Sequence, residues 1–398
     1  MTKIVICDDD PEFASALEEA AKEGLTQGQS QWTPDDIVKV HGNELNDSVV
    51  ILDRRRQAAR ANRDWPDETT PFDHDSLLIV DYDLRERGGV MTGETLAYLA
   101  RCFSGCDLII GVNQFNRVDF FDLTLKGHLE SWADLNIGWP QLRNPRFWGG
   151  SEPGFRPWYW PSLTRFQRHF QQRCQDVQAS LPSDAPIWQI LGLTADLFEM
   201  LPRSMGEFIG ADPATTTFLK FALESGEGLE PRDAEKRITN PDVLARVGAA
   251  RISKWLERWL LPRQDILVDA PHLVARYPSL LTGDRDDIET WDATARLANH
   301  NELGLNTEQI EAFRMQRQHW LSRPAWIWDS LRASEQILEV REPWRMEMPD
   351  WVFCEDTSRF RPRDDCRSFV AAVESPFALR FVEHIDDVEY RPQVRFSL

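Results

Sequence analysis

The stretch KIVICDDD, residues 3–10, decides the fold of the first third of this chain. It is an apolar run that ends in three consecutive carboxylates, and LLIVDYDL at 77–84 repeats the pattern with Asp81 at the end of its run. Short apolar runs of this kind are typical of strands buried on both faces of a parallel sheet. Because the carboxyl ends of such strands share one edge, we expect the carboxylates to gather there and to suit a hard divalent cation and a phosphoryl group.

Strands and helices alternate throughout residues 1–145. Asp10 is a suitable N-cap for a first helix that begins at Pro11. The patterns predict strands at 3–7, 37–40, 77–81, 108–110 and 134–137, and further helices near 45–62 and 94–102. Such alternation favours an α/β fold in which right-handed crossovers place helices on both faces of a five-stranded parallel sheet.

The quoted stretches, with GETLAYLARC at 93–102 and CDLIIGVNQ at 106–114, resemble the receiver domain of bacterial two-component response regulators. The resemblance implies a flavodoxin-like fold for the N-terminal third of the chain. It implies that Asp81 is the phosphoacceptor and that Asp8 and Asp9 bind Mg²⁺ together with Asp81. It also implies a phosphoryl donor, either a histidine kinase or a phosphotransfer protein.

Three features depart from the receiver pattern. The family's hydroxyl residue at the end of strand four should fall within Gly111-Val112-Asn113, which contains no Ser or Thr. The family's Lys-Pro pair aligns with Trp139-Pro140, and the connection between strands two and three is longer than usual. Lys126 or Arg117 is a candidate to replace the lysine. These losses affect the conformational switch more than the acceptor chemistry, so a pseudo-receiver that holds partners constitutively, or a phosphate sink, is the alternative.

Composition limits the remaining functions. The chain has 398 residues and a formal net charge of −20, which disfavours an electrostatic grip on nucleic acid or on an anionic membrane. The 6 cysteines show no CxxC spacing, so a zinc site of that kind is not predicted. No signal peptide and no apolar run long enough to span a bilayer is evident, so we expect a cytoplasmic protein.

The chain changes character after the receiver-like domain. Residues 146–185 are expected to form a Trp/Pro-rich strap and a connecting helix, 186–345 a helical domain, and 346–398 a β-rich module, as a small meander or barrel. The strap begins in the Trp-, Pro- and Gly-rich stretch 138–161. Exposing its aromatic rings together would create a large apolar patch, so a segment packed across two domains is favoured over a recognition surface.

The sequence therefore predicts a phosphoacceptor signalling protein, not an enzyme in its own right, which relays a phosphoryl group through a protein-binding output region. A third hypothesis makes the C-terminal region a catalytic effector with a pocket within 186–345. Bacterial stress or phage-defence signalling is a setting that would suit a receiver joined to an unfamiliar output.

Overall fold

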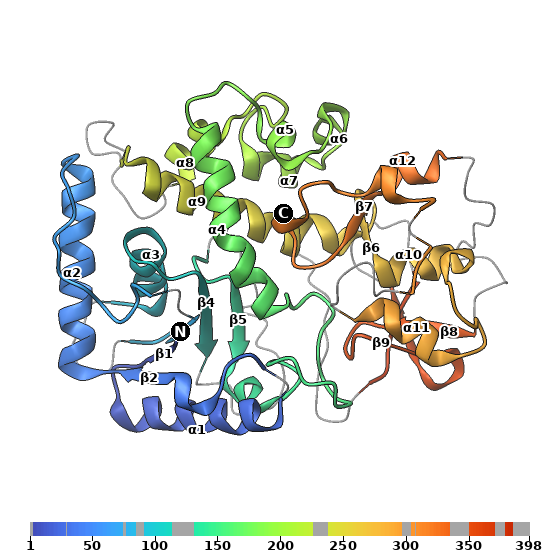
Figure 1. The fold of residues 1–398 in the computed structure, drawn as a ribbon, viewed down its shortest axis with the longest axis horizontal. Coiled ribbons are helices and arrows are strands. Elements are labelled where there is room, and N and C mark those ends of the chain that lie inside the picture. Colours follow the sequence, from blue (N-terminus) through green and yellow to red (C-terminus); the bar gives the residue numbers. More distant parts are fainter. Residues whose placement is uncertain are drawn as a thin grey trace.

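A computed structural model gives the fold of the chain (Figure 1). It describes residues 3–28, 30–74, 77–84, 91–113, 131–225, 238–296, 304–306, 308–334, 350–370 and 379–384.

A five-stranded parallel sheet forms the N-terminal part of the molecule. Its strands are β1 (Ile4–Cys7), β2 (Ile37–Val40), β3 (Leu77–Asp81), β4 (Leu108–Asn113) and β5 (Leu135–Gly138), and their order in the sheet is β2-β1-β3-β4-β5. Every neighbouring pair is parallel. The predicted α/β class and the five predicted strands are confirmed. The apolar runs of β1 and β3 are continuous because the sheet is covered on both faces.

Alternate side chains of these strands point into two different apolar cores. Ile4, Ile6 and their counterparts on β3 and β4 pack with α1 (Pro11–Gln27) and α4 (Leu163–Ser180). Val5, Cys7 and their counterparts pack with helices on the opposite face, which are α2 (Gly42–Arg60), α3 (Gly93–Phe103) and α9 (Pro241–Trp255). In Figure 1, α4 crosses in front of β4 and β5. Helices from beyond residue 145 therefore complete both faces of the sheet.

The middle of the chain is mainly helical, as predicted. After α4 come α5 (Ile187–Leu191), α6 (Ala195–Glu199), α7 (Arg203–Ile209), α8 (Phe218–Ser225), α10 (Ala270–Arg276), α11 (Ile288–Ala295) and α12 (Trp328–Arg332). A π-helical turn at Leu256–Leu260 and a 3₁₀ turn at Leu261–Arg263 extend α9, so the helical path passes Pro262, where the sequence predicts its end, and stops at the left-handed Gln264. A strand pair, β6 (Leu267–Asp269) with β7 (Ala325–Ile327), lies among these helices. Of the helices that the structure describes, none is both long and apolar enough to cross a bilayer.

The C-terminal part contains a small β-sheet, as expected, but neither the meander nor the barrel that the sequence predicts is found, because the described strands form an open sheet in a different order. The strands are β8 (Trp351–Cys354), β9 (Arg359–Pro362), β10 (Arg367–Val370) and β11 (Leu379–Val382), in the order β10-β11-β8-β9. Two antiparallel pairs are joined by a parallel contact between β8 and β11. A meander would place β9 beside β10, whereas β11 occupies the position next to β8.

The Trp/Pro-rich strap is an ordered segment that packs on both parts of the molecule. Its Trp148, Phe155, Trp158 and Trp160 side chains are all buried. On one side, the Trp148 indole Nε1 donates a 2.7 Å hydrogen bond to the carbonyl of Leu142, close to α1. On the other, the backbone N–H of Trp158 donates a 2.9 Å hydrogen bond to the carbonyl of Glu355, beyond β8.

Candidate functional site

Two carboxylates that the sequence singled out meet at the carboxyl edge of the parallel sheet. Asp81 is the last residue of β3, and Asp8 directly follows β1. Since Cys7 pairs with Val80, the two aspartates leave the paired strands at the same level. Both side chains are 0% exposed, so the site begins as two acidic groups buried side by side.

Short backbone turns fix one oxygen of each carboxylate. The backbone N–H of Asp10 donates a 2.9 Å hydrogen bond to Oδ1 of Asp8, and that of Asp83 donates a 3.1 Å hydrogen bond to Oδ2 of Asp81. Asp10 itself caps α1 as predicted, because its Oδ1 accepts a 2.7 Å hydrogen bond from the backbone N–H of Glu12. The helix cap therefore orients the chain that carries Asp8.

The proximity of Asp8 has an electrostatic consequence for Asp81. Burial raises the pKa of the Asp81 carboxyl to about 8, and the neighbouring charge of Asp8 acts in the same direction. The two backbone N–H groups of Tyr82 and Asp83 lower this pKa, but by less. Two buried like charges favour a proton or a cation between them.

Asp9 is half-buried next to Asp8. Over the described residues there is no group of three or more His, Cys, Asp or Glu side chains arranged to hold a metal ion, so Asp9 is not brought into a three-ligand cluster with Asp8 and Asp81. Magnesium commonly uses only one or two protein carboxylates and completes its octahedron with water and phosphate oxygens. The Asp8–Asp81 pair fits that requirement in its donor chemistry and in its excess of negative charge.

The ends of β4 and β5 carry the residues that the sequence alignment assigned to the hydroxyl and lysine positions of a receiver. Val112 pairs with Asp81, and Asn113 pairs with Gly138 at the end of β5. Trp139 follows directly, half-buried, with the guanidinium of Arg143 5.0 Å from its ring centroid. The candidate replacements Lys126 and Arg117 lie outside the described residues.

The start of α3 approaches the site more closely than the sequence suggested. A Cβ on Gly93 would lie 2.1 Å from the backbone oxygen of Asp81, so only glycine allows this approach. Thr92 caps the helix by accepting a 3.2 Å hydrogen bond from the backbone N–H of Thr95. The backbone N–H of Gly93 also donates a 2.9 Å hydrogen bond to the carbonyl of Tyr82, which ties the start of α3 to the end of β3. The threonine before the helical run GETLAYLARC was the available signal for this helix start.

Glu94 connects this edge of the sheet to residues 131–134, the segment that leads into β5. Its carboxylate accepts hydrogen bonds from the Ser131 hydroxyl and, at 2.9 Å, from the backbone N–H of Trp132. Lys254 of α9 reaches the same segment, where its buried Nζ donates to the carbonyl oxygens of Ser131 at 2.8 Å and Ala133 at 2.7 Å. A continuous set of contacts therefore runs from the end of β3 to a helix of the central region.

Comparisons of the chain with protein-family models, with curated proteins and with solved structures find no match.

Proposed function

We propose that this chain is a two-component signalling protein with a flavodoxin-like receiver domain, which accepts a phosphoryl group on Asp81. The observation that supports this best is the burial of Asp8 beside Asp81 at the carboxyl edge of a parallel sheet ordered β2-β1-β3-β4-β5. The donor is a phosphohistidine on a histidine kinase or phosphotransfer protein. Open α/β sheets bind ligands at this edge, so the location suits the chemistry.

The reaction follows from the position of the Asp81 carboxylate. One of its oxygens attacks the phosphorus in line, a C–O–P linkage forms, and the bond from phosphorus to the donor nitrogen breaks with its electron pair left on the imidazole. The ionised form is required, and burial beside Asp8 opposes ionisation at neutral pH. Bound Mg²⁺, held by Asp8 and Asp81 with Asp9 nearby, would offset the charge of the carboxylates and of the phosphoryl oxygens.

The contacts from α3 to α9 are a route for output to a protein partner. The set of contacts begins with Glu94 near Asp81. It ends at Lys254, which belongs to α9, the helix that packs on α3. A change in the position of α3 on phosphorylation would alter the surroundings of α9. This gives the helical region a physical connection to the acceptor site.

Phosphorylation by a small-molecule donor tests the proposal. The protein incubated with acetyl phosphate and Mg²⁺ is expected to gain the mass of one phosphate, and Asp81→Asn should abolish the gain because the nucleophile is removed. Asp83→Asn is the matched control, since it removes the same charge from the same turn and leaves the acceptor in place. Omission of Mg²⁺ in the presence of EDTA should also abolish the gain. An equal gain in the Asp81→Asn protein would refute the assignment.

A pseudo-receiver scaffold, or a phosphate sink without output, is the second candidate. Asn113 and Trp139 favour it, because they stand at the strand ends where a switching hydroxyl and a charge-neutralising lysine are needed. Trp139→Lys adds a cation at this edge. We expect it to increase the extent or lifetime of phosphorylation, as followed by intact mass over time. An unchanged extent and lifetime would show that residue 139 does not face the phosphoryl group.

A further inference from the structure

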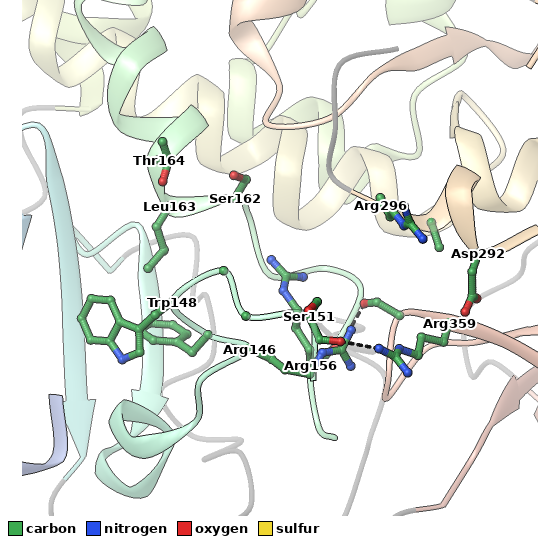
Figure 2. Close-up of a pocket in the computed structure, with 15 residues that line it drawn as sticks. Arg146, Trp148, Ser151, Arg156, Ser162, Leu163, Thr164, Asp292, Arg296 and Arg359 are labelled. Atoms are coloured by element: carbon green, nitrogen blue, oxygen red, sulfur yellow. Dashed lines mark hydrogen bonds between the residues drawn. The ribbon is translucent and has the colours of Figure 1, made fainter. Parts of the chain in front are cut away.

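A cavity of about 430 Å³ lies where the strap meets α11 and β9 (Figure 2). Its wall includes the strap residues Arg146 and Arg156, the first turn of α4, Arg296 after α11, and Arg359 on β9. These segments are far apart in sequence, and the hydrogen bonds between the strap and residues 355–357 hold them together. The cavity is separate from the carboxylate pair at the sheet edge.

The cavity wall is strongly cationic in a chain of net charge −20. Among the described residues, four arginines line it against a single carboxylate, that of Asp292. Asp292 is already engaged, because its Oδ1 accepts a 2.6 Å hydrogen bond from the backbone N–H of Phe360 and its Oδ2 lies 4.0 Å from Arg361. Within the described part of the wall, arginine guanidinium groups therefore outnumber carboxylates.

Arg146 is held in place by neutral acceptors. Its Nη1 donates to the carbonyl oxygens of Gly154 at 2.6 Å and Thr357 at 2.5 Å. The residue is only 7% exposed, and its buried Nε has no acceptor among the described residues. Carbonyl groups fix the guanidinium but do not neutralise it, so the arrangement holds a cation ready for an anionic ligand.

Arg156 is less well satisfied than Arg146. Its guanidinium makes contacts of 3.5 Å to the carbonyl oxygens of Trp160 and Pro161, which is the outer limit of a hydrogen bond. Burial lowers the pKa of Arg156 to about 9, and the charges of Arg146 and Arg323 act in the same direction. Burial, followed by the charge of Arg359, likewise lowers the pKa of Arg146 to about 10. A bound anion would relieve this repulsion.

The start of α4 adds donors to the same cavity. Ser162, the N-cap residue, lines the cavity together with Leu163 and Thr164, and its hydroxyl does not cap the helix. The first turn of this 18-residue helix contains no acidic residue. Its backbone N–H groups and the positive end of the helix dipole therefore reinforce the arginines. Figure 2 shows Ser162 and Thr164 above Arg156 and Ser151.

We propose that this cavity binds a small molecule that carries phosphoryl groups, in an interaction that does not depend on the proposed phosphoacceptor role of Asp81. Arginine recognises phosphate oxygens with paired N–H donors, and the volume falls in the range of pockets for small ligands. A nucleic-acid polymer is disfavoured, because its further phosphates would meet a chain of net charge −20. The ligand bridges the strap and the C-terminal sheet.

Calorimetric titration of the full chain tests the proposal with three probes: inorganic phosphate, pyrophosphate and ATP, each at constant ionic strength with EDTA present. We expect one molecule of pyrophosphate or ATP to bind per chain, more tightly than inorganic phosphate. Arg296→Glu should weaken binding about tenfold or more, because it reverses a charge on the wall. Arg296 is exposed and makes no hydrogen bond within the described residues, so this variant is expected to fold.

Two further variants test whether the ligand binds in this cavity and nowhere else on the chain. Arg63→Glu reverses an exposed charge outside the cavity and should leave the affinity unchanged. Asp81→Asn should also retain binding, which distinguishes this inference from the phosphoacceptor proposal. No saturable binding of any probe, or equal losses in Arg296→Glu and Arg63→Glu, would overturn the site. Binding of a single-stranded oligonucleotide that Arg296→Glu weakens, with none of the three probes bound, would overturn the assignment to a small molecule.

Discussion

At the scale of single residues, the most unusual groups are charges buried next to the sheet. Lys254 is one of them, since α9 carries its ammonium to the backbone carbonyls of Ser131 and Ala133. Burial lowers the pKa of Lys254 to about 7, although the carboxylates of Glu94 and Asp134 oppose the shift. Lys254 thus holds the segment that leads into β5 by hydrogen bonds. Its shifted pKa also makes the free energy of unfolding depend on pH.

Lys254 provides a pH prediction with a definite sign. Its pKa is lower in the folded than in the unfolded protein, so between about pH 7 and pH 10 the unfolded state binds more protons and stability rises with pH. In Lys254→Met this contribution is absent. We expect the unfolding free energy of the parent minus that of the variant to rise by about 2–4 kcal/mol from pH 6 to pH 10.

Urea denaturation at several pH values measures this difference. Burial raises the pKa of other groups, including Tyr98 and Cys102, and these groups also change the stability at high pH, but they are common to both proteins and cancel in the comparison. Lys220→Met, a change in a solvent-exposed lysine of α8, is the control and should give a difference that is flat with pH. A flat difference for Lys254→Met would show that this lysine is not desolvated in the folded state.

At the scale of elements, the close contact between β3 and α3 determines the geometry of the sheet edge that carries Asp81. A Cβ at Gly93 would meet the backbone of both Asp81 and Tyr82, at 2.1 and 2.8 Å. Backbone atoms cannot rotate away as a side chain does, so Gly93→Ala must displace α3 from the strand. We expect a loss of about 1–3 kcal/mol in unfolding free energy, and a reduced rate of the phosphorylation proposed for Asp81.

Gly206→Ala is the matched control for Gly93→Ala. It makes the same change within a helix, α7, where the nearest atom to the new Cβ would be a ring carbon of Pro213 at 3.0 Å. We expect its unfolding free energy to change by less than about 1 kcal/mol, because better helix propensity offsets the tight contact. Equal losses in the two variants, measured by urea denaturation, would mean that the contact with β3 has no special cost.

The parts of the fold that were predictable are those that local patterns determine. The strands that end at Cys7 and Asp81 are continuous apolar runs, and Asp10 with Pro11 marks a helix start, so these elements and the Asp8–Asp81 pair follow from the sequence. The order of the C-terminal strands depends on contacts between distant residues, such as Cys354 with Phe381, and no local pattern encodes them. The arginine-lined cavity was missed for the same reason, because its arginines span residues 146–359.

At the scale of the whole molecule, helices from the central region cover the parallel sheet together with α1, α2 and α3. Phe166 and Phe170 of α4 join the core on one face, and Val243 and Val247 of α9 join the core on the other. The first of these cores continues without a break to Phe360 in the C-terminal sheet. The sheet, the strap and the C-terminal region therefore share buried apolar area and should depend on one another for stability.

A shared core predicts one cooperative unfolding transition for the chain, which calorimetry can measure. Trp148 is the residue that tests it, because the strap carries this buried indole onto α1, where its ring lies 6.3 Å from that of Trp32. We expect Trp148→Ala to cost about 3–5 kcal/mol and to lower the midpoint of the entire transition. Met200→Ala, at a side chain that is 58% exposed, should leave the midpoint unchanged. Two resolved transitions, of which only one moves in Trp148→Ala, would show that the strap does not couple the sheet to the rest of the molecule.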